Sequence, residues 1–160
     1  MASMVMGETA IGGVSLAALV LAAQALASAA MCGVIWFVQV VHYPLFTGVD
    51  AARAADHAVE NQRRTSRVVL PFMLFEAATA LAIAVAPPPS VGREAAFAGL
   101  VLVLLLWAST LVVQVPLHAR LARDGHSPDV VSALVRTNWL RTVGWTARAI
   151  LALWMVSVGR

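Results

Sequence analysis

One stretch of the chain decides the fold. It reads Gln114-Val-Pro116-Leu-His118-Ala-Arg120, then a short polar loop, then Asn138-Trp-Leu-Arg141-Thr142. The first part ends one apolar run and the last part begins another. Two helices joined by a short connection lie antiparallel to each other. The polar side chains of both parts are therefore expected at the same end of a helical hairpin.

A similar arrangement occurs earlier in the chain. It reads Gln39-Val-Val-His42-Tyr43-Pro44, then a polar loop, then Asn61-Gln-Arg-Arg64-Thr65. The two glutamines are 75 residues apart, and the two asparagines are 77 residues apart. Correspondence at such a distance is typical of an internal repeat. The sequence thus predicts two parallel-repeat helical hairpins that bring Gln, His, Asn and Arg to one end of a bundle.

The composition indicates a membrane protein. Of the 160 residues, 61% are hydrophobic and 12% are charged, against about half and about a quarter in soluble domains. The length suits one domain, 1–160. The net charge of +3 does not indicate nucleic-acid binding, because the arginines lie between apolar runs instead of forming a basic face with aromatics. Cys32 is the only cysteine, so it forms no internal disulfide.

The apolar runs predict four transmembrane helices, since about 20 apolar residues cross a bilayer. The spans are expected at about 11–42, 67–86, 95–118 and 139–158. Asp50 is expected to cap a polar helix that continues into the second span. Pro87-Pro88-Pro89 should end that span, and Ser127 followed by Pro128 should begin the last helix. The predicted fold class is all-α, an integral membrane antiparallel four-helix bundle.

The arginines predict the orientation, because they favour the cytoplasmic side. The loops after the first and third spans carry most of them, with their flanks: Arg53, Arg63, Arg64, Arg67, Arg120, Arg123, Arg136 and Arg141. The opposite side has Arg93 and Arg160. Both large loops should face the cytoplasm across the inner membrane, with both termini on the non-cytoplasmic side. His126, in the second loop, is expected to face solvent.

Polar residues near the cytoplasmic end are predicted to line a pocket. The candidate ligand-binding residues are Gln39, His42, Tyr43, Gln114, Asn138, Trp145 and Arg148. Amide groups in lipid need internal partners, so they should point into the bundle. His118 is the candidate proton acceptor, and Arg141 would stabilise a developing oxyanion. The alternative is that these side chains only cap helices and hold arginine at the headgroups.

Two charges lie deeper in the predicted spans. Ionisable groups at such depth rarely face lipid, so Glu76 and Arg148 are expected to pair across the bundle. The third span would supply Ser109, Thr110 or Trp107 nearby. Glu76 is also a candidate catalytic residue. The alternative is a structural ion pair, or a Glu76 that stays protonated.

The histidines leave a cofactor open. His42 and His118 each lie at the end of a span and would supply axial ligands to a haem or two ligands to a metal. Glu-x-x-His, His-Glu-x-x-His and Cys-x-x-Cys patterns do not occur in the sequence. The sequence therefore assigns no cofactor and no other metal site.

The hairpin residues carry a family resemblance. Pro116-Leu-His118 closing the third helix and Asn138-Trp-Leu-Arg141-Thr142 opening the fourth resemble the anthrone-oxygenase-like family of small four-helix integral membrane proteins. In that family Asn usually stands at the position of His118 and His at that of Trp139, so both positions depart. The resemblance implies oxidation of a lipophilic aromatic molecule, which for some members is an anthrone oxidised to a quinone.

Three functions follow as hypotheses. The first is a membrane oxygenase or oxidoreductase that binds and oxidises a lipophilic aromatic or quinone-like molecule. The second is a non-catalytic subunit or assembly factor of a membrane complex, or a homo-oligomer, because the small residues between Ala22 and Gly33 suit close helix contacts. The third is a haem-binding membrane protein. The sequence names neither the ligand nor the partner.

Overall fold

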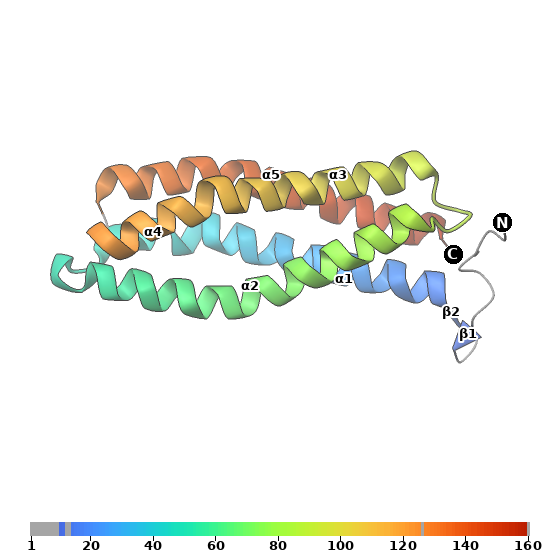
Figure 1. Ribbon diagram of the computed structural model, residues 1–160, viewed down its shortest axis with the longest axis horizontal. Coiled ribbons are helices and arrows are strands. Elements are labelled where there is room, and N and C mark those ends of the chain that lie inside the picture. Colours follow the sequence, from blue (N-terminus) through green and yellow to red (C-terminus); the bar gives the residue numbers. More distant parts are fainter. Residues whose placement is uncertain (1–9, 12–13, 126, 160) are drawn as a thin grey trace.

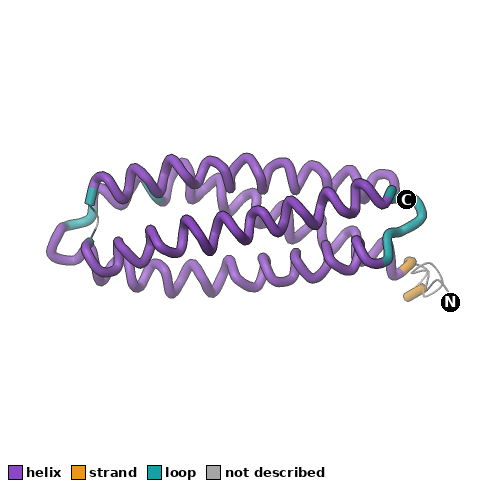
Figure 2. The backbone as a smooth tube through the Cα atoms, turned by 45° about the horizontal axis from the view of Figure 1, so that its top comes forward, coloured by secondary structure: helices purple, strands orange, loops and turns teal. Residues whose placement is uncertain are grey.

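The computed structural model describes residues 10–11, 14–125 and 127–159. Figure 1 shows long helical rods lying side by side, and Figure 2 shows that nearly all of the described chain is helical. The helices are α1 (Leu16–Phe37), α2 (Ala54–Val85), α3 (Arg93–Ser109), α4 (Val115–Asp124) and α5 (Pro128–Val158). The predicted all-α class is confirmed. A two-residue antiparallel pair, β1 (Ala10–Ile11) with β2 (Val14–Ser15), precedes α1.

The first rod begins later than predicted and ends irregularly. Its α-helix starts at Leu16 instead of residue 11, because the Ser15 side chain caps it by accepting a hydrogen bond from the Ala18 N–H. After α1 the backbone widens into a π-helix, η1 (Val38–His42), and then tightens into a 3₁₀ helix, η2 (Pro44–Gly48). A π-helix is rare and often marks a functional site.

The second rod is one continuous helix, as predicted. Asp50 caps the short 3₁₀ helix η3 (Ala51–Arg53), which leads directly into α2. The polar first half and the apolar second half of α2 therefore form a single rod that ends at Val85, before the proline run. Pro71 lies inside α2. Proline cannot donate the hydrogen bond to the carbonyl four residues earlier, so it weakens the helix there.

The third rod contains a second π-helix. It consists of α3, then η4 (Thr110–Gln114), then α4. Pro116 lies at the start of α4, directly after η4, and having no N–H it donates no hydrogen bond to the preceding turn. Gln39 and Gln114, which correspond in the predicted repeat, both lie in π-helices.

The last rod is α5, and its predicted start is confirmed. Ser127 accepts a hydrogen bond from the Val130 N–H, and Pro128 is the first helical residue. His126 and Arg160, and the residues before Ala10, lie outside the described residues. The expectations for the exposure of His126 and for the side of the membrane on which the termini lie therefore stay predictions.

Three stretches of the described chain are long and apolar enough to cross a membrane: Leu16–Gly48, Ala51–Val85 and Arg93–Asp124. They support the prediction of a membrane protein. The fourth predicted span, 139–158, falls within α5, which is not among the three. Arg141 and Arg148 lower its average hydropathy, although both side chains are buried.

The interior is built of apolar layers separated by polar ones. An apolar layer at the α4–α5 end contains Phe46 and Leu121, a central one contains Met31 and Trp145, and one at the opposite end contains Leu21 and other aliphatic side chains. Between the first two lies a polar layer with Gln39, Asn138 and Arg141, and between the last two lies one with Gln24, Ser28, Glu76 and Arg148. Buried polar groups need partners, and these side chains form hydrogen bonds with one another within each polar layer.

Candidate functional site

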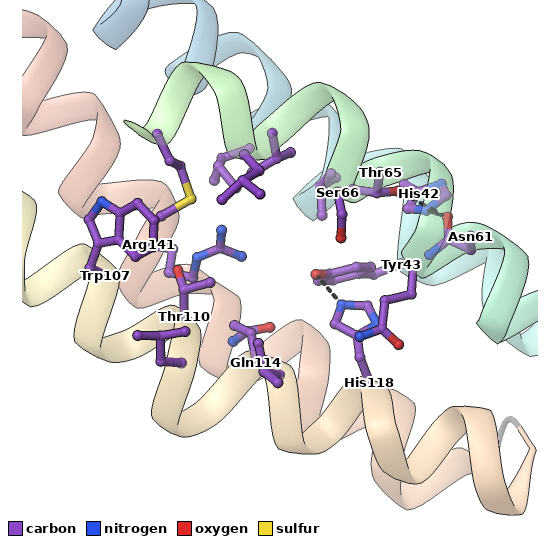
Figure 3. A pocket seen from close by; sticks show the side chains of 18 residues that line it. His42, Tyr43, Asn61, Thr65, Ser66, Trp107, Thr110, Gln114, His118 and Arg141 are labelled. Atoms are coloured by element: carbon purple, nitrogen blue, oxygen red, sulfur yellow. Dashed lines mark hydrogen bonds between the residues drawn. The ribbon is translucent and has the colours of Figure 1, made fainter. Parts of the chain in front are cut away.

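A cavity of about 200 Å³ lies in the first polar layer, between α2 and the α3–η4–α4 rod. Its lining combines aliphatic side chains with polar and aromatic ones, shown in Figure 3: His42, Tyr43, Asn61, Thr65, Ser66, Trp107, Thr110, Gln114, His118 and Arg141. An engineered cavity of about 150 Å³ holds benzene in another protein. This cavity is therefore large enough for one ring or a small fused ring system.

Arg141 is the charged group of the cavity. Its side chain is only 5% exposed, and in Figure 3 its guanidinium points into the space between the helices. Its Nη1 donates to the side-chain oxygen Oδ1 of Asn138 at 3.1 Å, and the guanidinium also interacts with Tyr43. Among the described residues, no carboxylate pairs with Arg141, and its Nε–H has no acceptor. An unbalanced buried charge of this kind favours an anionic or strongly polar ligand group.

Gln39 and Asn138 hold Arg141 in place from behind. The side-chain nitrogen Nδ2 of Asn138 donates to the side-chain oxygen Oε1 of Gln39 at 2.9 Å. The side-chain nitrogen Nε2 of Gln39 in turn donates to the backbone carbonyl of Val135 at 3.2 Å. Asn138 is fully buried, and neither amide is among the residues that line the cavity. The structure therefore gives these two predicted ligand-binding residues a positioning role behind the cavity wall.

Tyr43 and His118 form a hydrogen-bonded pair at the cavity. The Tyr43 hydroxyl lies 3.0 Å from His118 Nε2. Tyr43 is 4% exposed and comes from the turn between η1 and η2, whereas His118 comes from α4. A hydroxyl next to an imidazole can pass a proton to it. The predicted proton acceptor thus has a phenol as its direct neighbour.

Two other predicted residues line the cavity with hydrogen bonds of their own. His42 Nε2 lies 2.7 Å from the side-chain oxygen Oδ1 of Asn61, within the first hairpin. The side-chain nitrogen Nε2 of Gln114 donates to the Thr137 hydroxyl at 3.1 Å, while its side-chain oxygen Oε1 has no donor among the described residues. Arg141 Nε–H and the Trp107 indole N–H also have no partner among the described residues, so the wall residues leave two donors and one acceptor for a ligand.

The predicted pair of Glu76 and Arg148 is confirmed, but it lies outside the cavity lining. Arg148 Nε donates to Glu76, and both side chains are almost fully buried. Ser28 donates to the same carboxylate at 3.1 Å. With the oxygen and nitrogen of its side-chain amide exchanged, Gln24 accepts a hydrogen bond from Arg148. These partners come from α1 and not from the third span as expected. The cluster closes the second polar layer and joins α1, α2 and α5.

A glycine makes room for this cluster. A Cβ built on Gly99 of α3 would lie 2.9 Å from Arg148 Nη1. The glycine lets α3 approach the guanidinium closely, so the third rod also covers the pair. Through these bonds Glu76 contacts no residue of the cavity wall, so its catalytic role stays a prediction.

The two deep tryptophans differ in position. Trp145 is fully buried in the central apolar layer and is not among the residues that line the cavity. Trp107, on α3, lines the cavity instead. Of the two, Trp107 is therefore the tryptophan of the cavity wall, and the ligand-binding role of Trp145 stays a prediction.

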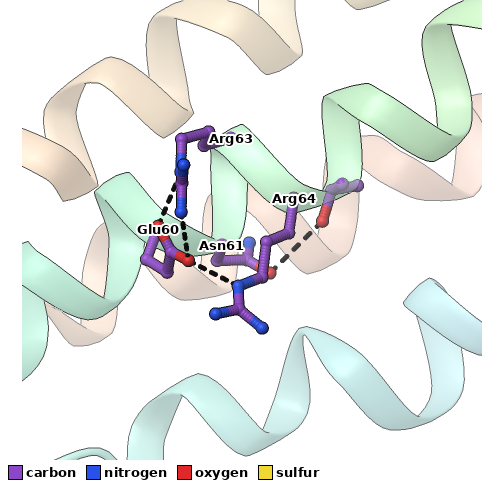
Figure 4. A network of polar contacts seen from close by, with 5 residues as sticks. Glu60, Asn61, Arg63 and Arg64 are labelled. Carbon is purple, nitrogen blue, oxygen red and sulfur yellow. Dashed lines mark hydrogen bonds and ion pairs between the residues drawn. The ribbon is translucent and has the colours of Figure 1, made fainter.

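Arg64, the counterpart of Arg141 in the predicted repeat, points out of the bundle. Its side chain is 75% exposed and pairs with Glu60 one turn earlier on α2 (Figure 4). Arg63 pairs with the same carboxylate at 2.7 Å. These hydrogen bonds lower the pKa of Glu60, which precedes the apolar part of α2, from 4.5 to about 2. The two arginines that correspond in the predicted repeat therefore differ in burial and in partner.

The described residues contain no cluster of three or more His, Cys, Asp or Glu side chains that could hold a metal ion. His42 and His118 both line the cavity, but each has its Nε2 next to a protein partner. Haem ligation through these atoms would require both hydrogen bonds to break.

Sequence reasoning missed several polar residues. Gln24 and Ser28 stand one helical turn apart in an otherwise apolar run, and that isolation was a usable signal. Thr65 and Ser66 line the cavity from α2, where the sequence pattern had indicated Asn61 and Arg64. Thr137 precedes Asn138 directly and receives the Gln114 hydrogen bond.

The fold and site define an all-α protein with helices of membrane-spanning length and a largely apolar cavity that contains a buried arginine. Comparison with protein-family models, with curated proteins and with solved structures finds no match for this chain. Its function is therefore argued from the site.

Proposed function

We propose that the chain forms an antiparallel four-helix bundle in the inner membrane, with the α1–α2 and α4–α5 connections on the cytoplasmic side. The three apolar rods support insertion. For the part of α5 that begins at Trp139, support comes from its outer face, because Arg141 and Arg148 are buried while the large exposed side chains are apolar: Trp139, Leu140, Val143, Ile150, Leu153 and Trp154. The arginines near the two connections support the orientation.

The cavity binds a lipophilic aromatic or quinone-like molecule that carries a polar oxygen. One observation carries this proposal: a buried guanidinium without a carboxylate partner faces a cavity with aromatic and aliphatic walls. The ligand oxygen accepts from Arg141, and a neighbouring hydroxyl can donate to the Gln114 carbonyl. The volume of about 200 Å³ accommodates the polar ring.

The chemistry that suits these groups begins with loss of a proton. His118 takes up the proton released by a ligand hydroxyl, passed on through the Tyr43 hydroxyl, and Arg141 balances the charge of the resulting oxyanion. The resemblance to the anthrone-oxygenase-like family extends the proposal to oxidation by dioxygen, in which a ring CH2 of the substrate loses both hydrogens and becomes a carbonyl with one oxygen atom of O2, while the other oxygen atom leaves as water. Glu76 takes no part, because its carboxylate is engaged by Arg148 and Ser28.

The test uses purified protein in liposomes, with 1,4-naphthoquinone as the binding probe and 1,8-dihydroxyanthrone as the oxidisable probe. His118→Ala should abolish oxidation while keeping naphthoquinone binding, and Arg141→Ala should weaken binding by roughly 100-fold, the effect expected for a buried charge-assisted contact. Arg64→Ala is the matched control and should behave as wild type. Full activity in both site variants would remove the assignment.

A second candidate function is favoured by the outer surface of α1. Ala22, Leu26, Ala29 and Gly33 are exposed on one stripe of this helix, and small residues allow close helix–helix contact in membranes. This surface suits a subunit of a membrane complex. Gentle solubilisation and sizing would show a stoichiometric partner or a second copy, and Ala29→Leu should release it.

A further inference from the structure

The cavity wall has an exposed rim on two facing rods only. Of the lining residues, four are exposed: Ser66 and Leu70 of α2, Leu111 of η4 and Val115 of α4. Leu70, Leu111 and Val115 are 46%, 56% and 42% exposed. The other lining side chains are buried or half-buried. The cavity therefore opens sideways, between α2 and the η4–α4 segment.

The backbones that flank this opening are both irregular there. Pro71 follows Leu70 directly and removes one helical hydrogen bond from α2. Leu111 lies within the π-helix η4, whose wider turn interrupts the α3–α4 rod. Proline and π-turns are the usual places where a helix bends. The two walls of the opening can therefore separate without breaking regular helices.

The route from the α4–α5 end is closed. Tyr43, Phe46 and Leu121 are 4%, 1% and 0% exposed, and they belong to the apolar layer that covers that end of the bundle. The hydrogen bond between Tyr43 and His118 crosses the same region. A ligand arriving from water would have to pass this layer, whereas one arriving from the side meets only the exposed rim.

The rim lies at the depth of the bilayer. Leu70 and Leu111 belong to the apolar parts of the second and third stretches that are long enough to cross a membrane. A molecule at the opening is therefore surrounded by acyl chains, and an apolar tail attached to its ring would remain in them.

We infer that the cavity is loaded from the bilayer through this lateral opening, and that its ligand is a ring-headed lipid. The polar ring enters between Leu70 and Leu111 and reaches Arg141, while an alkyl or isoprenoid tail stays outside among the lipids. A cavity of about 200 Å³ is smaller than the roughly 300–1,000 Å³ of typical ligand pockets. It has room for the ring and not for the tail. This inference rests on the proposed function of the cavity.

The experiment compares two quinones with the same ring in liposomes, one with a decyl tail and one without a tail. Leu111→Trp and Leu70→Trp place a large side chain at the opening, and Leu104→Trp is the control, because Leu104 is an exposed leucine of α3 outside the cavity lining. We expect each plugging variant to weaken binding of the tailed quinone by about tenfold or more and to change the equilibrium binding of the tailless one by less than about threefold. Leu104→Trp should leave both unchanged.

The outcomes separate the two proposals. If wild-type protein binds neither quinone, the proposed function is wrong. If it binds both, and the plugging variants bind the tailed quinone as wild type does, the lateral opening is wrong while the proposed function stands. If a plugging variant loses both quinones, Leu111→Ala decides: faster association of the tailed quinone supports the opening, and an unchanged rate overturns it.

Discussion

Two arginines of α5, Arg141 and Arg148, are equally buried and yet differently satisfied. They are 5% and 0% exposed and lie seven residues apart, about two helical turns. Arg148 has the carboxylate of Glu76, whereas Arg141 has the neutral side chains of Asn138 and Tyr43. A buried charge with a matched opposite charge holds helices together. A buried charge without one leaves a requirement that a ligand can meet. The comparison separates a structural layer from a binding layer within one helix.

The largest effect should come from unbalancing the structural layer. Arg148→Met leaves the Glu76 carboxylate buried without its counter-charge, and it should lower the free energy of unfolding by about 3–5 kcal/mol. Unfolding by SDS in detergent micelles, followed by tryptophan fluorescence, measures this change.

The double variant sharpens the same comparison. Glu76→Leu combined with Arg148→Met removes both charges and should recover most of the loss, because an apolar pair of similar volume needs no partner. A double variant as unstable as Arg148→Met would show that packing at Gly99 and Gln24, and not charge balance, determines the stability of this layer.

The binding layer should respond in the opposite way. Arg141→Met removes a charge that has no carboxylate among the described residues, so the free energy of unfolding should stay within about 1 kcal/mol of wild type. Binding of naphthoquinone should fall by roughly 100-fold. The measurements are SDS unfolding and quenching of tryptophan fluorescence, to which Trp107 at the cavity contributes. A large loss of stability would place Arg141 in the structural class with Arg148.

The asparagines that precede the two motif arginines provide a smaller effect. Asn138→Ala leaves a charged donor of Arg141 and the Gln39 carbonyl oxygen unpaired, and it should cost about 2 kcal/mol of unfolding free energy. Asn61→Ala removes only the hydrogen bonds to His42 and Thr65 at a half-buried position, and about 0.6 kcal/mol is expected, the average for interhelical bonds in a membrane protein. Equal values would mean that the two hairpins are equivalent after all.

Much of the fold could be predicted from the sequence because its signals are local. The apolar runs, the proline run after α2 and the Ser127–Pro128 start of α5 each act on neighbouring residues. The two π-helices were not predicted, since an apolar run contains no signal for where its hydrogen-bond pattern changes. The start of α1 was missed for a different reason, because the capping signal of Ser15 was overlooked.

The site was predicted in part, for reasons that particular residues make clear. Glu76 and Arg148 could be paired because they are isolated charges in apolar runs. Trp145 was predicted at the pocket, yet Trp107 lines the cavity, because the rotation of each helix decides which tryptophan meets it. The repeat suggested equal roles for Arg64 and Arg141, yet the residue before each asparagine differs, Glu60 in α2 and Thr137 in α5. Glu60 forms an exposed ion pair with Arg64, whereas Thr137 has no charge with which Arg141 could pair.

The smallest effect concerns that surface carboxylate. The pKa of Glu60 is lowered from 4.5 to about 2 by its hydrogen bonds with Arg63 and Arg64. A depressed carboxyl pKa adds stability above the unfolded value, and this stability is lost as pH falls from 4.5 towards about 2. Stability near neutral pH should thus be independent of Glu60 titration.

In a variant with Arg63→Met and Arg64→Met the carboxyl of Glu60 should titrate near its ordinary value again, measured by carbon-13 NMR of labelled glutamate side chains. Because the pair is exposed, naphthoquinone binding should not change. A shift in binding would mean that the outward arginines reach the cavity, and the contrast between the hairpins would then fail.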